Sequence, residues 1–243
     1  MRIGVIGTGT IASAVVQGIA GDGHTIMVSR RSAAHAARLE AAYALVSVAD
    51  NQQVLDQSDV VFIGLMPDVA PAVLGALRFR ADQQVISFMA DVPLAALAPM
   101  VAPAAQVSVM IPFPAIATGG SVIMTLGEAA TIHSLFGARN DIFALASQQE
   151  LGAFVCAQAV LSPAVKMVQD AAGWLGARVS DPQEAERFLR LLVASGLMGG
   201  ACDQTLAALD TPGGYNQRLR EHMVDSGCSD ALRRGLDQLE APK

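Results

Sequence analysis

The feature that most restricts the fold of this chain is a glycine-rich turn close to its start. The turn follows a short apolar run at residues 3–6 and leads into a segment whose apolar residues, Val15, Val16 and Ile19, have helical spacing. Between a strand and a helix, the pattern GxGxxA is typical of a dinucleotide-binding turn, because the glycines permit a tight turn and a close pyrophosphate and the alanine permits close packing. We therefore expect the turn to bind a diphosphate at the helix N-terminus, through Gly7, Thr8, Gly9, Thr10, Ile11 and Ala12. A glycine turn without a ligand is the alternative.

The end of the second expected strand indicates which dinucleotide is bound. An NAD site usually has an acid there, about 20 residues after the glycines, to hold the ribose hydroxyls. This chain has Ser29-Arg30-Arg31-Ser32 instead. Guanidinium groups and hydroxyls suit a 2′-phosphate, and no acid repels it. We therefore predict NADP(H) as the cofactor, bound by Ser29, Arg30 and Arg31; the alternative is that both arginines are solvated residues at a helix start.

The rest of the chain divides into two patterns. Further apolar runs lie at residues 25–28, 45–48, 59–65, 84–88, 107–110 and 121–125. Helical stretches separate several of them, which is typical of parallel strands joined by crossover helices. From residue 150 onward the sequence predicts helices alone. We predict an α/β fold: an N-terminal Rossmann domain with a mostly parallel sheet over residues 1–150, and an all-helical C-terminal domain for dimerisation and substrate binding over residues 151–243.

One helix in the C-terminal half has a clear start and a long apolar face. Asp181 is its expected N-cap, Pro182 its first residue and Glu184 the closing residue of a capping box. Gly196 and Gly200 form a small-xxx-small pattern that would let another helix approach closely. Hydrophobic residues make up 52% of the chain and charged residues only 16%, against a usual share of about 25%. We therefore expect a homodimer or a multiple of dimers.

Composition also excludes several classes of partner. The net charge is -6 and no basic run is present, so nucleic acid is not an expected partner. The cysteines Cys156, Cys202 and Cys228 are odd in number and lack metal-site spacing, which argues against a disulfide framework and against a metal site. The apolar stretch at residues 191–201 is too short to span a bilayer, which takes roughly 20 helical residues. We expect a soluble cytoplasmic protein that acts on a small molecule.

The order of the segments resembles that of the pyrroline-5-carboxylate reductase family over most of the chain. The segments are GTGTIA, SRRS, Val48-Ala49-Asp50-Asn51, VVFIGLMP ending at Pro67, SFMADVPLAAL, VSVMIPFPA, Ser162-Pro163-Ala164 and Thr211-Pro212-Gly213-Gly214. The resemblance implies a Rossmann domain, a helical domain that dimerises by interleaving with its mate, and reduction of a cyclic imine by a nicotinamide cofactor. It also implies that Asn51, Leu65, Met66 and Pro67 lie along the cofactor.

The chain departs from the family where the substrate would bind. Residues 110–114, Met-Ile-Pro-Phe-Pro, replace Met-Pro-Asn-Thr-Pro, and Asp91 replaces a glycine. The family's Pro-Gly-Gly-Thr-Thr, whose threonines help hold the substrate carboxylate, ends here in Tyr215 and Asn216. By resemblance the substrate site consists of Thr211, Gly213, Gly214, Tyr215 and Asn216. We predict weak or absent proline formation and a substrate with a larger apolar part or no carboxylate.

Residues 211–216 also have the pattern of a helix start. Thr211 or Asp210 is the expected cap, with Pro212 in the first turn, and free N–H groups there would cradle an anionic substrate. A plain helix start is the alternative.

The candidate catalytic residues are few. An iminium substrate arrives protonated, so the protein needs only to orient it and exclude water. The absence of an obvious His–Asp or Lys–Asp catalytic pair is compatible with such a substrate. Tyr215, with Asn216 beside it, is a candidate hydrogen-bond donor to the substrate; packing is the alternative role for Tyr215. Lys166 lies in an apolar helical stretch, as the single helix lysine of β-hydroxyacid dehydrogenases does. His133 and His222 are expected at the surface.

These observations lead to one favoured function and two alternatives. We predict an NADPH-dependent oxidoreductase that reduces a C=N bond in a small cyclic imine or amino-acid-like substrate. The alternatives are a β-hydroxyacid dehydrogenase-like enzyme that uses Lys166, and a dinucleotide-binding protein without catalytic activity.

Overall fold

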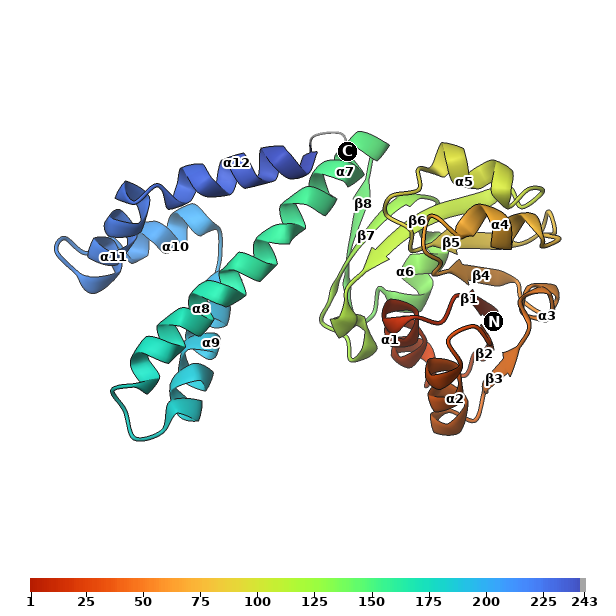
Figure 1. Cartoon of the computed structure of the whole chain (residues 1–243), viewed down its shortest axis with the longest axis horizontal. Helices are drawn as coiled ribbons and strands as arrows, with labels where there is room; N and C mark the ends of the chain where they lie inside the picture. The colour runs from red at the N-terminus through yellow and green to blue at the C-terminus, as the bar shows by residue number, and fades with distance from the viewer. Residues whose placement is uncertain (241–243) are drawn as a thin grey trace. The chain divides into compact units, whose positions relative to one another are not determined.

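The computed structural model describes residues 1–240 and has two compact units, one ending at Gly152 and the other beginning at Ala153. The division falls within α7 (Gln148–Ala157), next to the expected domain boundary at residue 150 (Figure 1). The first unit contains every strand that the structure describes, and the second is helical. The predicted fold class, a mostly parallel Rossmann sheet followed by a helical region, is confirmed.

The first unit is built on one eight-stranded sheet with the order β3-β2-β1-β4-β5-β6-β7-β8. Its strands are β1 (Arg2–Ile6), β2 (Thr25–Ser29), β3 (Val46–Ala49), β4 (Val60–Ile63), β5 (Gln84–Ser87), β6 (Gln106–Pro112), β7 (Val122–Gly127) and β8 (Asp141–Leu145). The first six are parallel, β7 is antiparallel to β6, and β8 is parallel to β7. The order reverses between β1 and β4, and in open α/β sheets this is where ligands bind, beyond the carboxyl ends of the strands.

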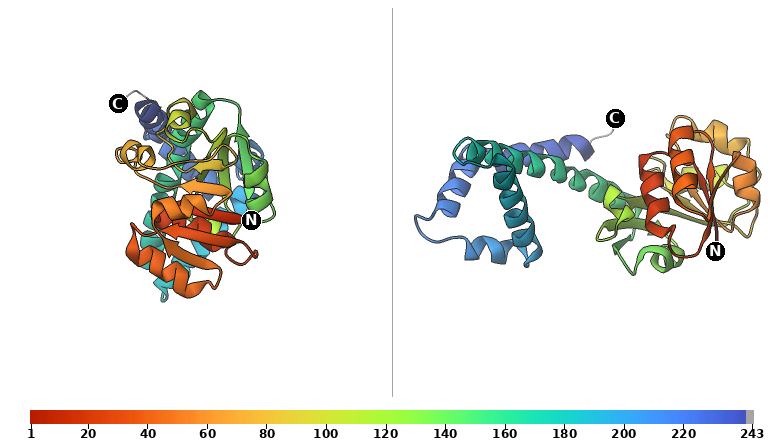
Figure 2. Two further views of the ribbon diagram at one scale, coloured as in Figure 1. Left: turned by 90° about the vertical axis from the view of Figure 1, so that its right-hand side faces the viewer. Right: turned by 90° about the horizontal axis from the view of Figure 1, so that it is seen from below.

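Helices cover both faces of this sheet (Figure 2). One face carries α1 (Thr10–Ile19), α2 (Ala33–Ala42) and α6 (Ala130–Phe136), together with the 3-10 turn η1 (Pro114–Ala117). The other carries α3 (Asn51–Asp56), α4 (Ala70–Gly75) and α5 (Leu94–Met100). Because both faces are covered, the central strands are apolar on both sides, and β4 is fully buried along its length.

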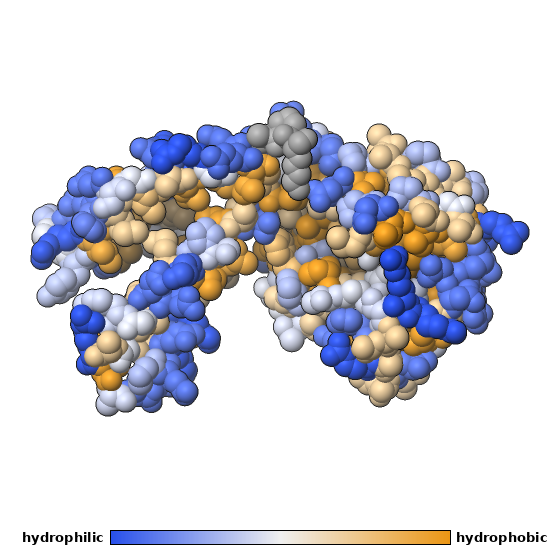
Figure 3. Space-filling model, viewed as in Figure 1, coloured by the Kyte–Doolittle hydropathy of each residue, from blue (hydrophilic) through white to orange (hydrophobic). Residues whose placement is uncertain are grey.

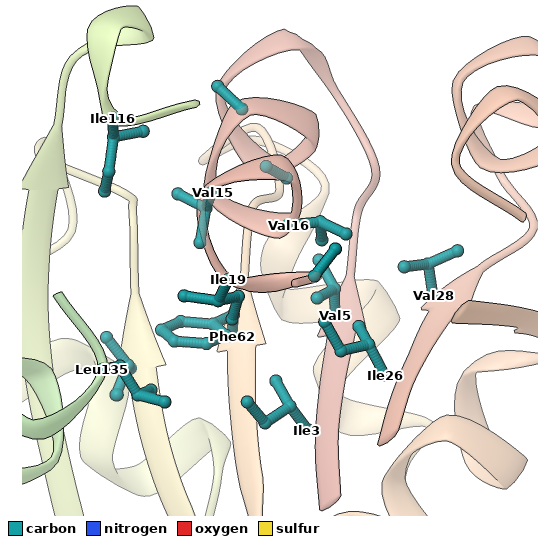
Figure 4. Packing of buried hydrophobic residues seen from close by; sticks show 14 of the residues in the cluster. Ile3, Val5, Val15, Val16, Ile19, Ile26, Val28, Phe62, Ile116 and Leu135 are labelled. Carbon is teal, nitrogen blue, oxygen red and sulfur yellow. The ribbon is translucent and has the colours of Figure 1, made fainter. Parts of the chain in front are cut away.

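The core of the first unit is closely packed around Phe62. Its ring stacks on Phe88 at a centroid distance of 5.3 Å and meets Phe136 edge-on at 6.2 Å. Val15 and Ile19 of α1 lie over the same face of the sheet (Figure 4). This packing fixes α1 against the strands, and with it the position of the glycine-rich turn that precedes the helix.

After α7, the elements of the second unit are all helical as far as residue 240. These are the 3-10 turn η2 (Gln158–Val160), α8 (Leu161–Gly176), α9 (Pro182–Met198), α10 (Cys202–Ala208), α11 (Tyr215–Asp225) and α12 (Cys228–Glu240). Helices α8 and α9 pack against each other, and the residues that they bury in this single chain are small, Ala172 and Ala185. Large apolar side chains such as Phe188, Leu192 and Trp174 are exposed. Figure 3 shows hydrophobic surface among the hydrophilic surface of the molecule.

One helical run is long and apolar enough to cross a membrane when judged by length and composition alone. It extends over Gln148–Gly176, a longer segment than the stretch at residues 191–201 considered from the sequence. The core helix of a soluble protein meets the same criteria, so the run is weak evidence of a membrane span.

The structure corrects three details of the predicted elements. Strand β8 was not expected, because it is a short edge strand with an exposed Phe143. Asp181 caps α9 as predicted and accepts from the amides of Gln183 and Glu184. The Glu184 carboxylate does not close the expected capping box; it accepts from Arg187 Nη1 at 3.1 Å. Gly200 lies beyond the end of α9, so Gly196 and Gly200 do not share a helix face.

Candidate functional site

The turn after β1 has the geometry that its glycines predict. Gly7 has a φ of +90°, and a Cβ there would stand 2.4 Å from the carbonyl oxygen of Gly64, so no other residue fits. A Cβ on Gly9 would meet nothing within 4 Å, which leaves open space over the backbone at that point. Ala12 is buried against Gly64, where a larger side chain would collide with the end of β4. The turn therefore presents its backbone to the space beyond the sheet.

The first amides of α1 point into that space. Gly9 is the N-cap and supplies no side chain, and the first amide with a helical partner is that of Ser13, which donates to the Gly9 carbonyl at 2.9 Å. The amides of Thr10, Ile11 and Ala12 precede it and have no acceptor within the helix. Free amides and the helix dipole together favour a bound anion, so this end of α1 fits a diphosphate.

Thr8 and Ser29 hold the turn in shape. Thr8 is fully buried, and its hydroxyl donates to the Ser29 carbonyl at 3.0 Å. The Ser29 hydroxyl is also buried and accepts from the Gly7 amide at 2.8 Å. The sequence predicted Ser29 as a contact to the cofactor phosphate. The structure places its hydroxyl inside the turn instead, because the Gly7 amide, at its positive φ, needs an acceptor.

Arg30 and Arg31 follow directly and are exposed at the carboxyl end of β2. Among the described residues 1–240, neither forms an ion pair. Ser32 is the N-cap of α2 and its hydroxyl makes no capping bond. Ser29 contacts Gly7, so the arginines that follow Ser29 lie next to the anion-binding turn. No acidic residue occurs between Ser29 and Leu39.

The other expected cofactor residues lie at the same edge of the sheet. Asn51 is the first residue of α3, after β3, and Asp50 caps that helix by accepting from the Gln53 amide at 2.9 Å. After β4, Leu65 is buried, and Met66 and Pro67 are exposed. Four neighbouring strands, β3, β2, β1 and β4, thus contribute their carboxyl ends to one edge, as a dinucleotide site requires.

Two further strand ends complete this edge. Asp91 follows β5 and is exposed. At the end of β6, Pro112 is buried while Ile111 and Phe113 are half-buried. The edge next to the expected cofactor segments therefore combines an exposed carboxylate with an apolar wall.

The predicted helix start at residues 211–216 is wrong in its position. Helix α11 begins at Tyr215 with Gly214 as its N-cap, and residues 212–213 form a turn before it. The amide of Gly213 donates to Gln217 Oε1 at 2.7 Å, and that of Gly214 to the Thr211 carbonyl at 2.9 Å. These two amides are therefore occupied, and the proposed anion cradle is reduced to the first amides of α11 itself.

The side chains at the start of α11 differ in exposure and surroundings. Tyr215 is 91% exposed in the single chain. Asn216 lines an open cavity of about 1,020 Å³ at the surface of the second unit. Apolar side chains of α8, α9, α11 and α12 form most of the wall of this cavity, among them the exposed Trp174 and Leu219. No motif predicted it, because the residues that line it come from four helices far apart in the sequence.

Lys166 belongs to an ion pair that the sequence analysis did not find. It lies on the exposed surface of α8, and its Nζ donates to the carboxylate of Asp170, one turn further along the helix. The i,i+4 spacing of this surface pair was readable from the sequence. His133 and His222 are exposed, as expected.

Comparison with known proteins yields matches by sequence and matches by structure. A family model described as NADP oxidoreductase, coenzyme F420-dependent, matches residues 2–91. Pyrroline-5-carboxylate reductase 3 from Xenopus laevis is 30% identical over 137 residues, which are 54% of this chain and 50% of that protein. The chain thus spans about half the length of this curated relative in the match.

Two solved structures share the fold over nearly the whole chain. The pyrroline-5-carboxylate reductase of Streptococcus pyogenes matches with a TM-score of 0.83 and 21% identity, over 99% of this chain and 98% of that one. A reductive aminase from Aspergillus terreus, in complex with NADPH4, cyclohexanone and allyl amine, matches with a TM-score of 0.61 and 18% identity, over 99% and 88%.

Proposed function

We propose that the chain is a divergent member of the pyrroline-5-carboxylate reductase family and an NADPH-dependent oxidoreductase that reduces a C=N bond. The substrate is a small cyclic imine or an amino-acid-like molecule. The observation that carries the proposal is the combination of a free helix N-terminus at α1 with Arg30 and Arg31 at the neighbouring strand end. The family model that matches residues 2–91, described as NADP oxidoreductase, coenzyme F420-dependent, supports the same dinucleotide.

The residues of the first unit fit this cofactor. The amides of Thr10, Ile11 and Ala12 would hold the diphosphate, the open space at Gly9 admits it, and Arg30 and Arg31 would pair with the 2′-phosphate. Asn51, Leu65, Met66 and Pro67 would line the rest of the cofactor at the ends of β3 and β4. When bound, NADPH supplies the hydride.

A C=N substrate suits the residues that this chain offers. An iminium ion carries its proton already, so the protein has to bind it, orient it and keep water away. Ile111 and Phe113 give the edge of the sheet an apolar wall, and Asp91 places a negative charge there that favours a cation. The complex of the Aspergillus terreus reductive aminase with a ketone and an amine shows that a protein of this fold binds the components of an imine.

We further propose that the substrate differs from pyrroline-5-carboxylate. Tyr215 and Asn216 replace the two threonines that the family resemblance leads one to expect, and two amides of the segment, those of Gly213 and Gly214, are occupied. A carboxylate would find fewer donors here, and losing a hydrogen bond to it costs roughly 1.5 to 3 kcal/mol. A substrate with a larger apolar part or without a carboxylate is favoured.

The assembly proposed for the protein is a homodimer or a multiple of dimers. The exposed apolar side chains of α8 and α9, including Val165, Phe188 and Leu192, would be covered by a second copy. Such a cover also accounts for the apolar run over Gln148–Gly176 without a membrane. We propose a soluble, cytoplasmic enzyme whose partners are its small substrate and its own second copy.

A second candidate function is a β-hydroxyacid dehydrogenase-like reaction. The observation that favours it is the ion pair of Lys166 with Asp170 on α8, since a lysine ammonium group can donate a proton to a carbonyl oxygen. A protein that binds the dinucleotide without turnover is the remaining alternative.

The test is substrate-dependent oxidation of NADPH by the whole protein. The panel contains pyrroline-5-carboxylate, cyclic imines without a carboxylate, and 2-ketoacids, with 3-hydroxyacids assayed in the reverse direction. We expect turnover of the imines. The control variant is Arg187→Met, which also removes one partner of an exposed ion pair within a helix. The second candidate would be supported if the protein turned over the acids and lost this activity in Lys166→Met but kept it in Arg187→Met. Binding of NADPH without any turnover would refute both.

The cofactor choice is tested separately by fluorescence titration. We expect NADPH to bind at least about tenfold more tightly than NADH, because each charge-assisted contact to the 2′-phosphate contributes about 1.5 to 3 kcal/mol. Arg30→Ala with Arg31→Ala should remove this preference and leave NADH binding nearly unchanged. Equal affinity of the unmutated protein for both cofactors would refute the assignment.

A further inference from the structure

The first unit has a groove that the proposed reaction does not use. It lies between α1, α2 and η1 and has a volume of about 450 Å³. Its lining residues are Thr10, Ser13, Ala14, Gln17, His35, Arg38, Leu39, Ala42, Tyr43, Pro114 and Ala117. Of the glycine-rich turn only Thr10 takes part, and neither Arg30 nor Arg31 does. The volume is within the range of small-molecule sites, about 300 to 1,000 Å³.

The charge of this groove is opposite to that of the protein. The chain has 22 acidic and 16 basic residues, excluding histidine, yet the ionisable side chains that line the groove are Arg38, His35 and Tyr43. No carboxylate is among them. The nearest acid on α2, Glu40, accepts from the Val48 amide at 3.1 Å. The groove is therefore a local site of positive charge without a counter-ion in its lining.

The hydrogen bonds in the groove fix the direction of its donors. Arg38 Nη2 lies 2.9 Å from His35 Nδ1, and Ser13 Oγ lies 3.3 Å from the same nitrogen. Because a guanidinium only donates, His35 Nδ1 is the acceptor and the proton of the neutral ring is on Nε2. Arg38 forms no ion pair among residues 1–240, so its other N–H groups and the His35 Nε2–H are available as donors.

The remaining lining of the groove is apolar. Ala14, Leu39, Ala42, Pro114 and Ala117 come from α1, α2 and η1. A ligand would therefore pack an apolar part against these side chains while its anionic group meets Arg38 and His35. A ligand with an ammonium group, such as an amino acid, would find no carboxylate to pair with.

We propose that this groove binds a small organic anion, a carboxylate or a phosphate ester, that has an apolar part and no ammonium group. Of the residues proposed to bind the cofactor, only Thr10 also lines this groove, so we expect the two ligands to be bound at the same time. Since Thr10 and Ser13 belong to the first turn of α1, the ligand would contact the helix whose N-terminus faces the diphosphate.

The experiment measures binding of phenyl phosphate, benzoate and inorganic phosphate to the whole protein by calorimetry at constant ionic strength. We expect saturable binding of phenyl phosphate or benzoate, and weaker binding of inorganic phosphate, which lacks the apolar part. Arg38→Ala should weaken binding about tenfold or more, since it removes a charge-assisted contact. Arg78→Ala, which removes an exposed arginine of the same unit outside the groove, should leave it unchanged.

Two further measurements separate this site from its neighbours. The ring signals of His35, identified by their absence in His35→Gln, should shift on addition of phenyl phosphate, while those of His133 should not. Phenyl phosphate should bind equally well with NADPH present. Displacement by NADPH would show that the anion occupies the cofactor site, and affinity unchanged in Arg38→Ala would show that it binds elsewhere; either result overturns the proposal.

Discussion

The two units of this chain use similar apolar residues in different ways. In the first unit, side chains such as Phe62, Ile63 and Leu97 are fully buried within the chain. In the second, among the described residues, only Ala172 and Ala185 are buried hydrophobic residues, while Phe188, Leu192 and Trp174 remain exposed. Binary patterning alone does not distinguish the two cases. The first unit completes its core with its own strands and helices, and the second leaves its apolar face for another surface to cover.

The same difference applies to the two parts of the proposed site. The residues proposed to bind the cofactor lie on a sheet edge fixed by a closed core, and the hydrogen bond between Ser29 and Gly7 and the packing of Ala12 hold the turn in place. The segment proposed to bind the substrate, residues 211–216, leads into the start of α11 in the second unit. We therefore expect substitutions in the first unit to change folding or cofactor binding, and those in the second to change assembly or substrate choice.

The largest expected effect is that of Phe62→Ala. The side chain is fully buried and stacks on Phe88, so its loss leaves a cavity and lowers the free energy of unfolding of the first unit by about 3 to 5 kcal/mol. Hydrogen exchange of the amides in β1 and β4 measures this change. Unchanged protection there would mean that the first unit is not held by its own core.

The matched substitution in the second unit is Phe188→Ala. This ring is 57% exposed in the single chain, so the protection of β1 and β4 should not change. If a second copy buries it, the loss corresponds to roughly 1.5 to 3 kcal/mol and weakens self-association about tenfold to a hundredfold. Sedimentation over a range of concentrations measures the effect. A concentration-independent monomer of the unmutated protein would contradict the proposed assembly.

The third prediction concerns Tyr215 and Asn216, at the start of α11 in the second unit. Tyr215→Thr with Asn216→Thr restores the hydroxyl donors expected by resemblance and should raise kcat/KM for pyrroline-5-carboxylate about tenfold, without changing the affinity for NADPH. Steady-state kinetics with pyrroline-5-carboxylate and NADPH, each varied in turn, measure these changes. Efficient proline formation by the unmutated protein would show that the departures at these positions do not exclude the family substrate.

The smallest expected effect concerns a surface ion pair of the first unit. Hydrogen bonding from Arg2, the largest cause, holds the pKa of Asp59 below its ordinary value. A carboxylate whose pKa is lowered by folding stabilises the folded state at any pH above its ordinary pKa, about 3.9. This stabilisation is lost as the pH falls through the lowered pKa of the folded state. Asp59→Asn should therefore lower Tm slightly at neutral pH, and the difference should vanish in acid. A large decrease in Tm at pH 7 would contradict the conclusion that the core provides most of the stability of the first unit.

The sequence predicts local features of this molecule well, because each depends on residues close together in the chain. The spacing of Gly7, Gly9 and Ala12 predicts a strand, a turn and a helix, and Asp181 with Pro182 predicts the start of α9. The early parallel strands follow from apolar runs separated by helices. In each case the physical cause is a backbone conformation, a cap or a periodic face that a few residues determine.

Features that depend on competing partners were predicted less well. Thr211 was expected to cap a helix, but Gln217 takes the Gly213 amide and the helix begins at Tyr215. Glu184 was expected to close a capping box, but Arg187 provides a charged partner one turn away. The grooves and cavities combine helices from distant segments, and no single motif describes them.

The hydrogen bond from the Gly7 amide to the Ser29 hydroxyl limits how the proposed preference for NADPH can change. A switch toward NADH by placing an acid at position 29 would put a charge in a fully buried position and remove the hydroxyl that supports the turn. Selection for a new cofactor would then have to accept damage to the diphosphate site as well. Arg30 and Arg31 are exposed and do not support the turn. Substitutions at these two positions can therefore change the cofactor preference, in evolution or by design, without this damage.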